Sequence, residues 1–149
     1  MQTSMKNGPP VSGELWLVDT SVLIRILDNV SPTADAWLKS KKGSLVGSEL
    51  LEVETFRVLR NRGQNVGHAT ALLDEFTLIA ITPDVMRSAR EYTVKIRAGD
   101  AIHLATAELL KDVKVVVATH DTQQAAAAAA LGLAVIDPIT DDPLRPAVA

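Results

Sequence analysis

Short apolar runs alternate along this chain with longer segments in which apolar residues recur every three or four positions. The apolar runs have the length of buried strands and lie at 15–18, 45–46, 78–81, 113–118 and 133–136. The segments between them follow a helical period and lie at 22–27, 32–38, 48–62, 67–75, 83–96, 99–110 and 123–131. This alternation predicts an α/β fold, a three-layer sandwich whose mainly parallel central sheet is flanked by helices.

Capping residues support several of these boundaries. Ser31 followed by Pro32 is a common start of a helix, and Pro83 opens another. Gly63 and Gly132 stand just after helical segments, where a left-handed backbone conformation often ends a helix. The sequence thus predicts where two helices begin and where two others end.

The length of 149 residues fits one domain, which we expect to span 15–137. The polar segment 1–14 predicts a flexible N-terminal extension, and the proline-containing segment 138–149 predicts a loose C-terminal tail. No apolar run approaches the roughly 20 residues that cross a membrane, and the start lacks the apolar centre of a secretory signal. These features favour a cytoplasmic protein.

Composition excludes several classes of function. The chain has no cysteine, which removes disulfide frameworks, cysteine-ligated zinc, iron–sulfur clusters and thiol catalysis. Its formal charge of −3 does not suit a basic coat for nucleic acid. Aromatic residues make up only 3% of the chain, too few for a platform on which several bases stack. An enzyme that meets nucleic acid through metal ions is compatible with this composition.

Acidic residues follow two of the predicted strands. Asp19 comes directly after the first strand, and Asp121 comes shortly after the strand at 113–118. Ligands of open parallel sheets bind beyond the carboxyl ends of the strands, so we expect both side chains at one edge of the sheet. Each aspartate taken alone is more simply explained as a turn former or a helix cap.

Glu54 stands in an apolar stripe of its predicted helix, because leucine and valine side chains occupy the positions one turn away. A carboxylate in such a place is costly unless it is paired or binds a metal ion. An ion pair with Arg57 is the simpler of the two explanations. Glu52, in contrast, has more polar neighbours, so its carboxylate needs neither a partner nor a metal ion.

Asp100 stands at the start of a predicted helix, where capping that helix is its simplest role. His103 follows one turn later, and a satisfied, partly buried histidine is the simplest explanation for it. His68, His103 and His120 have no partner at the i, i+4 spacing of a zinc site. The sequence therefore predicts no zinc site.

If the four acids meet in space, their repulsion has to be relieved by protonation or by a cation. Oxygen ligands favour the hard ions Mg²⁺ and Mn²⁺, which keep bound waters. One such water can become a nucleophile, and the oxygens of a phosphodiester can complete the coordination. The acids therefore indicate metal-dependent hydrolysis of a phosphodiester.

Four motifs, taken in order, resemble the PIN domain family. They are LVDTSVL around Asp19, SELLEVE ending at Glu54, AGDAIHLAT around Asp100 and THD ending at Asp121. The stretch at 127–136 is also similar, so the likeness covers about 15–137. Within the family the chain looks most like the toxins of bacterial VapBC toxin–antitoxin systems. The long segment before Leu15 departs from the family, whose chains begin almost at the first strand.

The resemblance implies a metal-dependent endoribonuclease that hydrolyses RNA as the toxin of a type II toxin–antitoxin pair. It assigns metal binding and catalysis, with Mg²⁺ or Mn²⁺ as cofactor, to Asp19, Glu54, Asp100 and Asp121. The hydroxyl of Thr20 or Ser21 would support Asp19. The resemblance also implies a homodimer held inactive by a cognate VapB-type antitoxin, whose tail occupies the acidic groove.

Other α/β folds with acidic sites fail at particular positions. A haloacid-dehalogenase-type phosphatase has a second aspartate where Ser21 stands, and an integrin-type metal site has serine where Leu23 stands. Neither a glycine-rich dinucleotide loop nor a phosphate-binding Gly-Lys-Ser/Thr loop is present. Two alternatives stay open: a non-catalytic PIN-like module that binds RNA or protein, and a DNA nuclease with the same acidic site.

Two basic clusters are candidates for the track along which a substrate lies. One cluster consists of Lys39, Lys41 and Lys42. The other consists of Arg57, Arg60 and Arg62. A solvated helix face explains each cluster more simply, so the test is whether charge reversal at Arg57 or Arg60 weakens binding of RNA or antitoxin.

Overall fold

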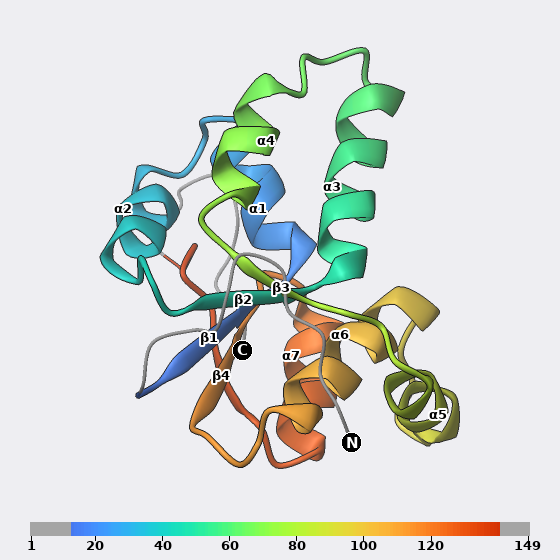
Figure 1. Ribbon diagram of the computed structural model, residues 1–149. Coiled ribbons are helices and arrows are strands. Elements are labelled where there is room, and N and C mark those ends of the chain that lie inside the picture. Colours follow the sequence, from blue (N-terminus) through green and yellow to red (C-terminus); the bar gives the residue numbers. More distant parts are fainter. Residues whose placement is uncertain (1–12, 141–149) are drawn as a thin grey trace.

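The computed structural model describes residues 13–140, which form one five-stranded sheet flanked by helices (Figure 1). Neighbouring strands pair in parallel throughout, in the order β3-β2-β1-β4-β5. The strands are β1 (Leu15–Val18), β2 (Leu45–Ser48), β3 (Thr77–Ile79), β4 (Val115–Ala118) and β5 (Ala134–Ile136). The order of connection reverses at β1, which has β2 on one side and β4 on the other. Open α/β sheets bind ligands at such a point.

Helices lie against both faces of this sheet, so the predicted three-layer α/β sandwich is confirmed (Figure 1). The helices are α1 (Thr20–Leu27), α2 (Pro32–Ser40), α3 (Glu49–Asn61), α4 (Gly67–Leu73), α5 (Pro83–Glu91), α6 (Ala98–Leu109) and α7 (Thr122–Ala130). In Figure 1, α1 to α4 stand on one side of the sheet and α5 to α7 on the other. None of the helices described is both long and apolar enough to cross a membrane.

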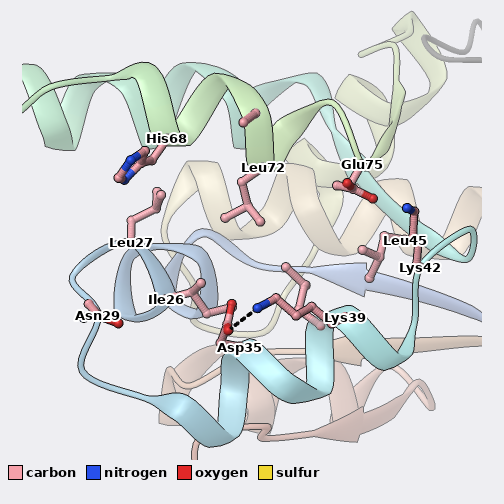
Figure 2. Close-up of a pocket in the computed structure, with 12 residues that line it drawn as sticks. Ile26, Leu27, Asn29, Asp35, Lys39, Lys42, Leu45, His68, Leu72 and Glu75 are labelled. Atoms are coloured by element: carbon pink, nitrogen blue, oxygen red, sulfur yellow. Dashed lines mark ion pairs between the residues drawn. The ribbon is translucent and has the colours of Figure 1, made fainter.

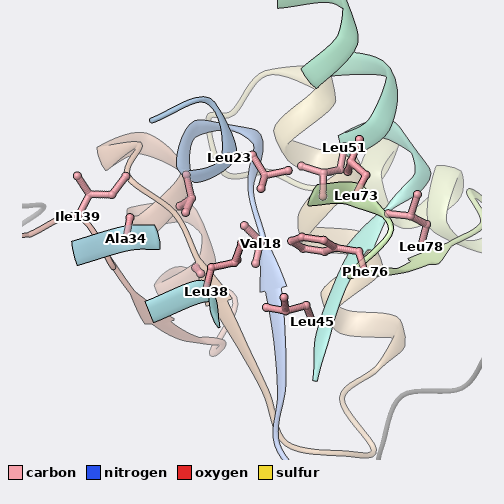
Figure 3. Close-up of a cluster of buried hydrophobic side chains, with 12 residues drawn as sticks. Val18, Leu23, Ala34, Leu38, Leu45, Leu51, Leu73, Phe76, Leu78 and Ile139 are labelled. Atoms are coloured by element: carbon pink, nitrogen blue, oxygen red, sulfur yellow. The ribbon is translucent and has the colours of Figure 1, made fainter. Parts of the chain in front are cut away.

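Successive residues of β1 pack into two separate hydrophobic clusters, one on each face of the sheet. Val18 belongs to the cluster under α1 to α4, together with Leu23 and Phe76 (Figure 3). Leu17 belongs to the cluster on the opposite face, together with Leu104 of α6. Because both faces of β1 are covered, the strand is apolar at every position, as its sequence indicated.

The glycines predicted to end helices do so. Gly63 has a φ of 69° and follows α3, and Gly132 has a φ of 79° and follows α7. Residues with a side chain rarely adopt this left-handed conformation, which explains why glycine occupies both places. Ser31 caps α2 as predicted, since its hydroxyl accepts a hydrogen bond from the backbone N–H of Ala34.

Helix α5 is shorter than its sequence pattern suggested. It was expected to reach residue 96, but it ends at Glu91 because Tyr92 adopts an extended conformation with a ψ of 135°. The Tyr92 ring packs against the hydrophobic cluster on the α6 face, and its hydroxyl donates a hydrogen bond to Glu108. The helix therefore ends earlier than its sequence pattern predicts, at the point where Tyr92 packs against the rest of the protein.

The chain is packed beyond residue 137, where the domain was expected to end. Ile139 is fully buried in the cluster that contains Ala34 and Leu38. Just before it, Asp137 Oδ2 lies 2.9 Å from Nδ1 of the buried His120 and fixes the end of this segment. Residues 1–12 and 141–149 are outside the described residues. The predicted N-terminal extension falls mainly on the first of these segments, and the predicted tail mainly on the second.

Candidate active site

Asp19 is held at the carboxyl end of β1 by hydroxyl groups from two segments. Although it stands at the start of α1, its carboxylate makes no cap hydrogen bond, so the helix-cap explanation is wrong. Oδ2 instead accepts hydrogen bonds from Ser21 Oγ at 2.8 Å and from Thr119 Oγ1 at 2.9 Å. Thr119 directly follows β4, and Asp19 is only 4% exposed. The ends of β1 and β4 thus meet at one buried carboxylate.

Glu54 of α3 is oriented by partners on two other helices. Its Oε1 accepts a hydrogen bond from Thr20 Oγ1 at 2.6 Å and lies 2.7 Å from His103 Nε2. The simpler explanation for Glu54, an ion pair with Arg57, is wrong, because the Arg57 guanidinium donates to Asn61 at 2.7 Å. Burial raises the pKa of Glu54, but the hydrogen bonds from His103 and Thr20 outweigh burial and leave the pKa lowered. The charged carboxylate is therefore the favoured form.

His103 is fully buried on α6 and connects the two carboxylates just described. Its Nδ1 lies 3.0 Å from Ser48 Oγ, while its Nε2 lies 2.7 Å from Glu54 and 3.8 Å from Asp19 Oδ1. Burial lowers the pKa of His103, but the hydrogen bond with Glu54 and the charge of Asp19 raise it by more. The histidine is satisfied, as the sequence suggested, although it is completely rather than partly buried.

Asp100 and Asp121 face each other across Arg97. Helix α6 begins after Arg97, so Asp100 lies in its first turn and is not its cap. Arg97 Nε donates to Asp100 Oδ2 at 3.3 Å, and Arg97 Nη2 donates to Asp121 Oδ2 at 3.0 Å. Asp121 does cap a helix, because its Oδ1 accepts hydrogen bonds from the backbone N–H groups of Gln123 and Gln124 in α7. The other carboxylate oxygen of Asp121, Oδ2, is the one that accepts the hydrogen bond from Arg97.

The structure places all four predicted acids in the lining of one groove of about 630 Å³. The arginines that line the same groove are Arg25, Arg57, Arg62 and Arg97. Of the predicted arginine cluster, Arg57 and Arg62 therefore reach the groove, and Arg60 is not among its lining residues. Acidic and basic side chains thus share one opening, which suits a substrate that carries negative charge near bound cations.

The lysine cluster belongs to a different surface. Lys39 and Lys42 line a second groove of about 800 Å³, whose other walls come from α1, α4 and the start of β2 (Figure 2). Lys41 instead lies over the ring of Trp16, 4.3 Å from its centre. The second groove is the larger of the two, but none of the four predicted site acids lines it.

The acidic groove suits a divalent cation by the chemistry of its donors. Burial and the charge of Asp19 raise the pKa of Asp100, and Arg97 opposes this shift. A hard cation relieves such repulsion and takes carboxylate oxygens as ligands. In the described part of the chain, however, no three acidic or histidine side chains are arranged to hold one ion. Two of the four acids are instead engaged with other side chains: Glu54 with His103, and Asp121 with Arg97.

Sequence reasoning missed the residues that organise the acids. Arg97 was given no role, and Thr119 was noted only as part of the THD motif, because a single arginine or threonine near a helix start carries no local signal. The sequence places Gly99 at a helix start, but a Cβ there would lie 2.7 Å from Glu54 Oε2. Helix α6 thus passes so close to the Glu54 carboxylate that the absence of a side chain matters. The AGD motif contained this signal, but the sequence alone did not show what the glycine faces.

Comparison with known proteins points to one family. The family model for the PIN domain matches residues 16–130. A toxin–antitoxin complex from Klebsiella pneumoniae is similar, with a TM-score of 0.64, 25% identity, and coverage of 82% of this chain and 96% of that chain.

Two further solved structures share the fold at lower identity. VapBC2 from Rickettsia felis, bound to a DNA fragment from its promoter, has a TM-score of 0.66 and 10% identity, and the match covers 83% of this chain and 98% of that one. FitAB bound to an IR36 DNA fragment has a TM-score of 0.60 and 21% identity, with 83% and 95% covered. No curated protein matches the chain in sequence.

Proposed function

Since this chain belongs to the PIN domain family, whose members are nucleases, we propose that it is a metal-dependent endoribonuclease and the toxin of a type II toxin–antitoxin pair. The observation that carries the proposal is that acids from four separate segments line one groove: Asp19, Glu54, Asp100 and Asp121. A module that only binds RNA would gain affinity by losing these charges. Their presence together favours catalysis over binding alone.

Asp19 and Asp100 are the proposed ligands of Mg²⁺ or Mn²⁺, with Glu54 and Asp121 completing the site directly or through water. When bound, such an ion supplies a water nucleophile and neutralises charge on the phosphodiester. The chain's own hydrogen bonds prepare the ligands for this task. Ser21 and Thr119 orient Asp19, and His103 and Thr20 orient Glu54. Preorganised ligands need less rearrangement when the ion and the substrate arrive.

The arginines of the acidic groove are the proposed contacts to the RNA backbone. Arg57 lies one turn from Glu54 on α3, and its guanidinium is exposed. Arg62 is held in place by Asp28, with Nη1 at 3.0 Å from both carboxylate oxygens. Phosphate contacts of this kind supply affinity without reading sequence. In this proposal the acids serve cleavage, and the arginines bind the RNA backbone.

The test is cleavage of RNA by the purified chain with Mg²⁺ or Mn²⁺, with and without a chelator. We expect cleavage that the chelator abolishes and that Asp19→Asn loses, while Asp84→Asn retains it. Asp84 is the matched control, because it is a partly exposed aspartate paired with Arg87 outside the acidic groove. Equal cleavage by wild type and Asp19→Asn would remove the catalytic proposal. Preferential cleavage of a competing DNA would instead establish a DNA nuclease with the same acids.

The larger groove is the proposed docking surface for a cognate VapB-type antitoxin. Ile26, Leu27 and Leu72 point into it, and the ion pair between Asp35 and Lys39 lies at its side (Figure 2). An apolar floor with charged edges suits an amphipathic helix. Helix α1 lines both grooves, so one partner segment can pass from the larger groove to the acidic groove. The toxin–antitoxin complex among the similar structures supports this choice of partner.

Co-expression with the product of a short adjacent reading frame tests the docking surface. We expect a complex that elutes as one species and no longer cleaves RNA. Ala71→Glu, which places a charge in the groove, should prevent this complex and keep cleavage. Ala129→Glu changes an exposed alanine of α7 outside both grooves and should leave the complex intact.

We also propose that the free chain is a homodimer. Light scattering of the free chain tests this proposal.

A further inference from the structure

Arg97 lies where the proposed function places a cation. Its Nε donates to Asp100 Oδ2 at 3.3 Å, and its Nη2 donates to Asp121 Oδ2 at 3.0 Å. One guanidinium therefore bridges two carboxylates, one in the first turn of α6 and one at the cap of α7, that are 21 residues apart in the chain. A planar guanidinium presents several N–H donors at once, which is why it can bridge two acids where an ammonium would contact one.

The two acids are fixed by the backbone, whereas the arginine side chain is not. Asp100 sits in the first turn of α6, and Asp121 is held by its cap hydrogen bonds to α7. Gln124 ties the two helices together, because its buried side-chain amide donates to the backbone oxygen of Asp100 at 3.3 Å. The Arg97 side chain, in contrast, is 73% exposed. It can leave without disturbing the fold.

The charge of Arg97 acts on the groove in the sense that a metal ion would. It places a positive charge between Asp100 and Asp121, two of the four acids that line the groove. An exposed guanidinium pairs only weakly with a carboxylate, because solvent screens the interaction. A divalent ion carries twice the charge and binds carboxylate oxygens directly. The arginine is thus a suitable occupant that a divalent ion can displace.

We propose that Arg97 is a built-in competitor for the metal site: it pairs with Asp100 and Asp121 in the metal-free chain and leaves them when a divalent ion binds. The inference rests on the proposed function for the identity of the metal ligands and adds a regulation of that site. Arg97 thereby lowers the affinity for metal and sets the metal concentration at which the site fills. Its positive charge also reduces the repulsion between the carboxylates of the acidic groove when no metal is bound.

The experiment is calorimetric titration of the full chain with Mn²⁺ in the absence of RNA. We expect Arg97→Gln to bind Mn²⁺ about three- to fivefold more tightly than wild type, which corresponds to the loss of a weak competing ion pair. Arg97→Lys keeps the charge but loses the bridge between two acids, so its affinity should fall between the two. The metal-free Arg97→Gln chain should also melt at a lower temperature, because its acids are left unneutralised.

Arg57→Gln is the control for charge alone. It removes one positive charge from the same groove, but the Arg57 guanidinium contacts Asn61 and not an acid. Its Mn²⁺ affinity should stay within about twofold of wild type, since solvent screens an exposed charge that is not in contact. An equal gain in Arg57→Gln would show a general charge effect and overturn the inference. Unchanged, weaker or absent Mn²⁺ binding in Arg97→Gln would overturn it as well.

Cleavage of RNA by wild type separates this inference from the proposed function. Normal cleavage together with unchanged Mn²⁺ affinity in Arg97→Gln rejects the competitor role and leaves the nuclease proposal standing. Tighter Mn²⁺ binding in Arg97→Gln without any cleavage by wild type supports the competitor role and rejects the nuclease proposal. The role of Arg97 would then hold for a metal site that does not cut RNA.

Discussion

Oε1 of Glu54 lies 2.7 Å from Nε2 of His103, although the two residues are 49 positions apart in the chain. The ring is fully buried, and its other nitrogen lies 3.0 Å from Ser48 Oγ at the end of β2. A carboxylate of the proposed metal site is therefore positioned from inside the protein and not from the surface. Its orientation depends on how α3 and α6 pack against each other.

Replacing His103 with glutamine should destabilise the metal-free protein. Glutamine cannot reproduce both ring hydrogen bonds, so a buried polar group loses its partner, at a cost of about 1–3 kcal/mol in the free energy of unfolding. Urea unfolding followed by circular dichroism measures this change. The exposed His68 is the control, and His68→Gln should leave the unfolding curve in place. Equal stability of wild type and His103→Gln would contradict the positioning role.

Substituting Gly99 with alanine should separate stability from activity. The residue lies in the first turn of α6, where alanine improves helix propensity by up to about 1 kcal/mol. The new Cβ would stand 2.7 Å from Glu54 Oε2, so the carboxylate has to move. We expect Gly99→Ala to melt within a few degrees of wild type, because the gain in helix propensity offsets part of the cost of moving the carboxylate, and to cleave RNA more slowly. Full cleavage by this variant would show that the position of Glu54 is not critical.

Arg57 and Arg60 should differ in their effect on RNA binding, although they lie on the same helix. Arg57 lines the acidic groove and Arg60 does not. Charge reversal at Arg57 should weaken RNA binding by about fivefold or more and flatten its salt dependence, because a phosphate contact is lost. Fluorescence anisotropy with chelator present measures binding without cleavage. Arg60→Glu serves as the charge-matched control, and an equal loss in both variants would place the RNA elsewhere.

The hydrogen bond from Tyr92 to Glu108 should give the protein a specific sensitivity to high pH. Burial and the adjacent Glu108 raise the pKa of Tyr92 above its ordinary value of 10.0. The unfolded chain therefore releases this proton before the folded chain does. The stability that Tyr92 contributes is fully present below pH 10 and is lost as the pH rises further.

The variant Tyr92→Phe tests this relationship. At neutral pH it should cost about 1 kcal/mol of unfolding free energy, because one partly buried hydrogen bond is removed. Above pH 10 the difference between wild type and variant should shrink. Parallel loss of stability in both proteins across this range, measured by urea unfolding, would argue against a shifted tyrosine.

Truncating Ile139 should reveal how far the folded domain extends. The side chain is fully buried and belongs to the hydrophobic cluster that also contains residues of α1, α2 and β1. Ile139→Ala should lower the free energy of unfolding by about 2–5 kcal/mol, the usual cost of removing a large aliphatic group from a core. Val113→Ala changes an aliphatic side chain that is 46% exposed and should cost less than about 0.5 kcal/mol. Similar values for both variants would place the end of the domain before Ile139.

Local patterns in the sequence were enough to determine the layers of the fold. Strands buried on both faces are apolar throughout, as Leu17 and Val18 illustrate, and such runs can be recognised without knowing their partners. The parallel arrangement then brings Asp19 and Asp121 to one edge, because both follow strands in the same direction. For this reason the sequence alone predicted the α/β sandwich and the region in which the acids gather.

Only the tertiary structure decided which side chains meet there. The sequence offered Arg57 as the partner of Glu54, since a residue one turn away is the only neighbour that helical spacing can indicate. The partners found are Thr20 and His103, which lie 34 and 49 positions away, and a guanidinium from Arg97 joins Asp100 to Asp121. A buried or half-buried polar group binds whatever donor packing brings within reach, and packing joins segments whose spacing in the chain carries no record of the contact.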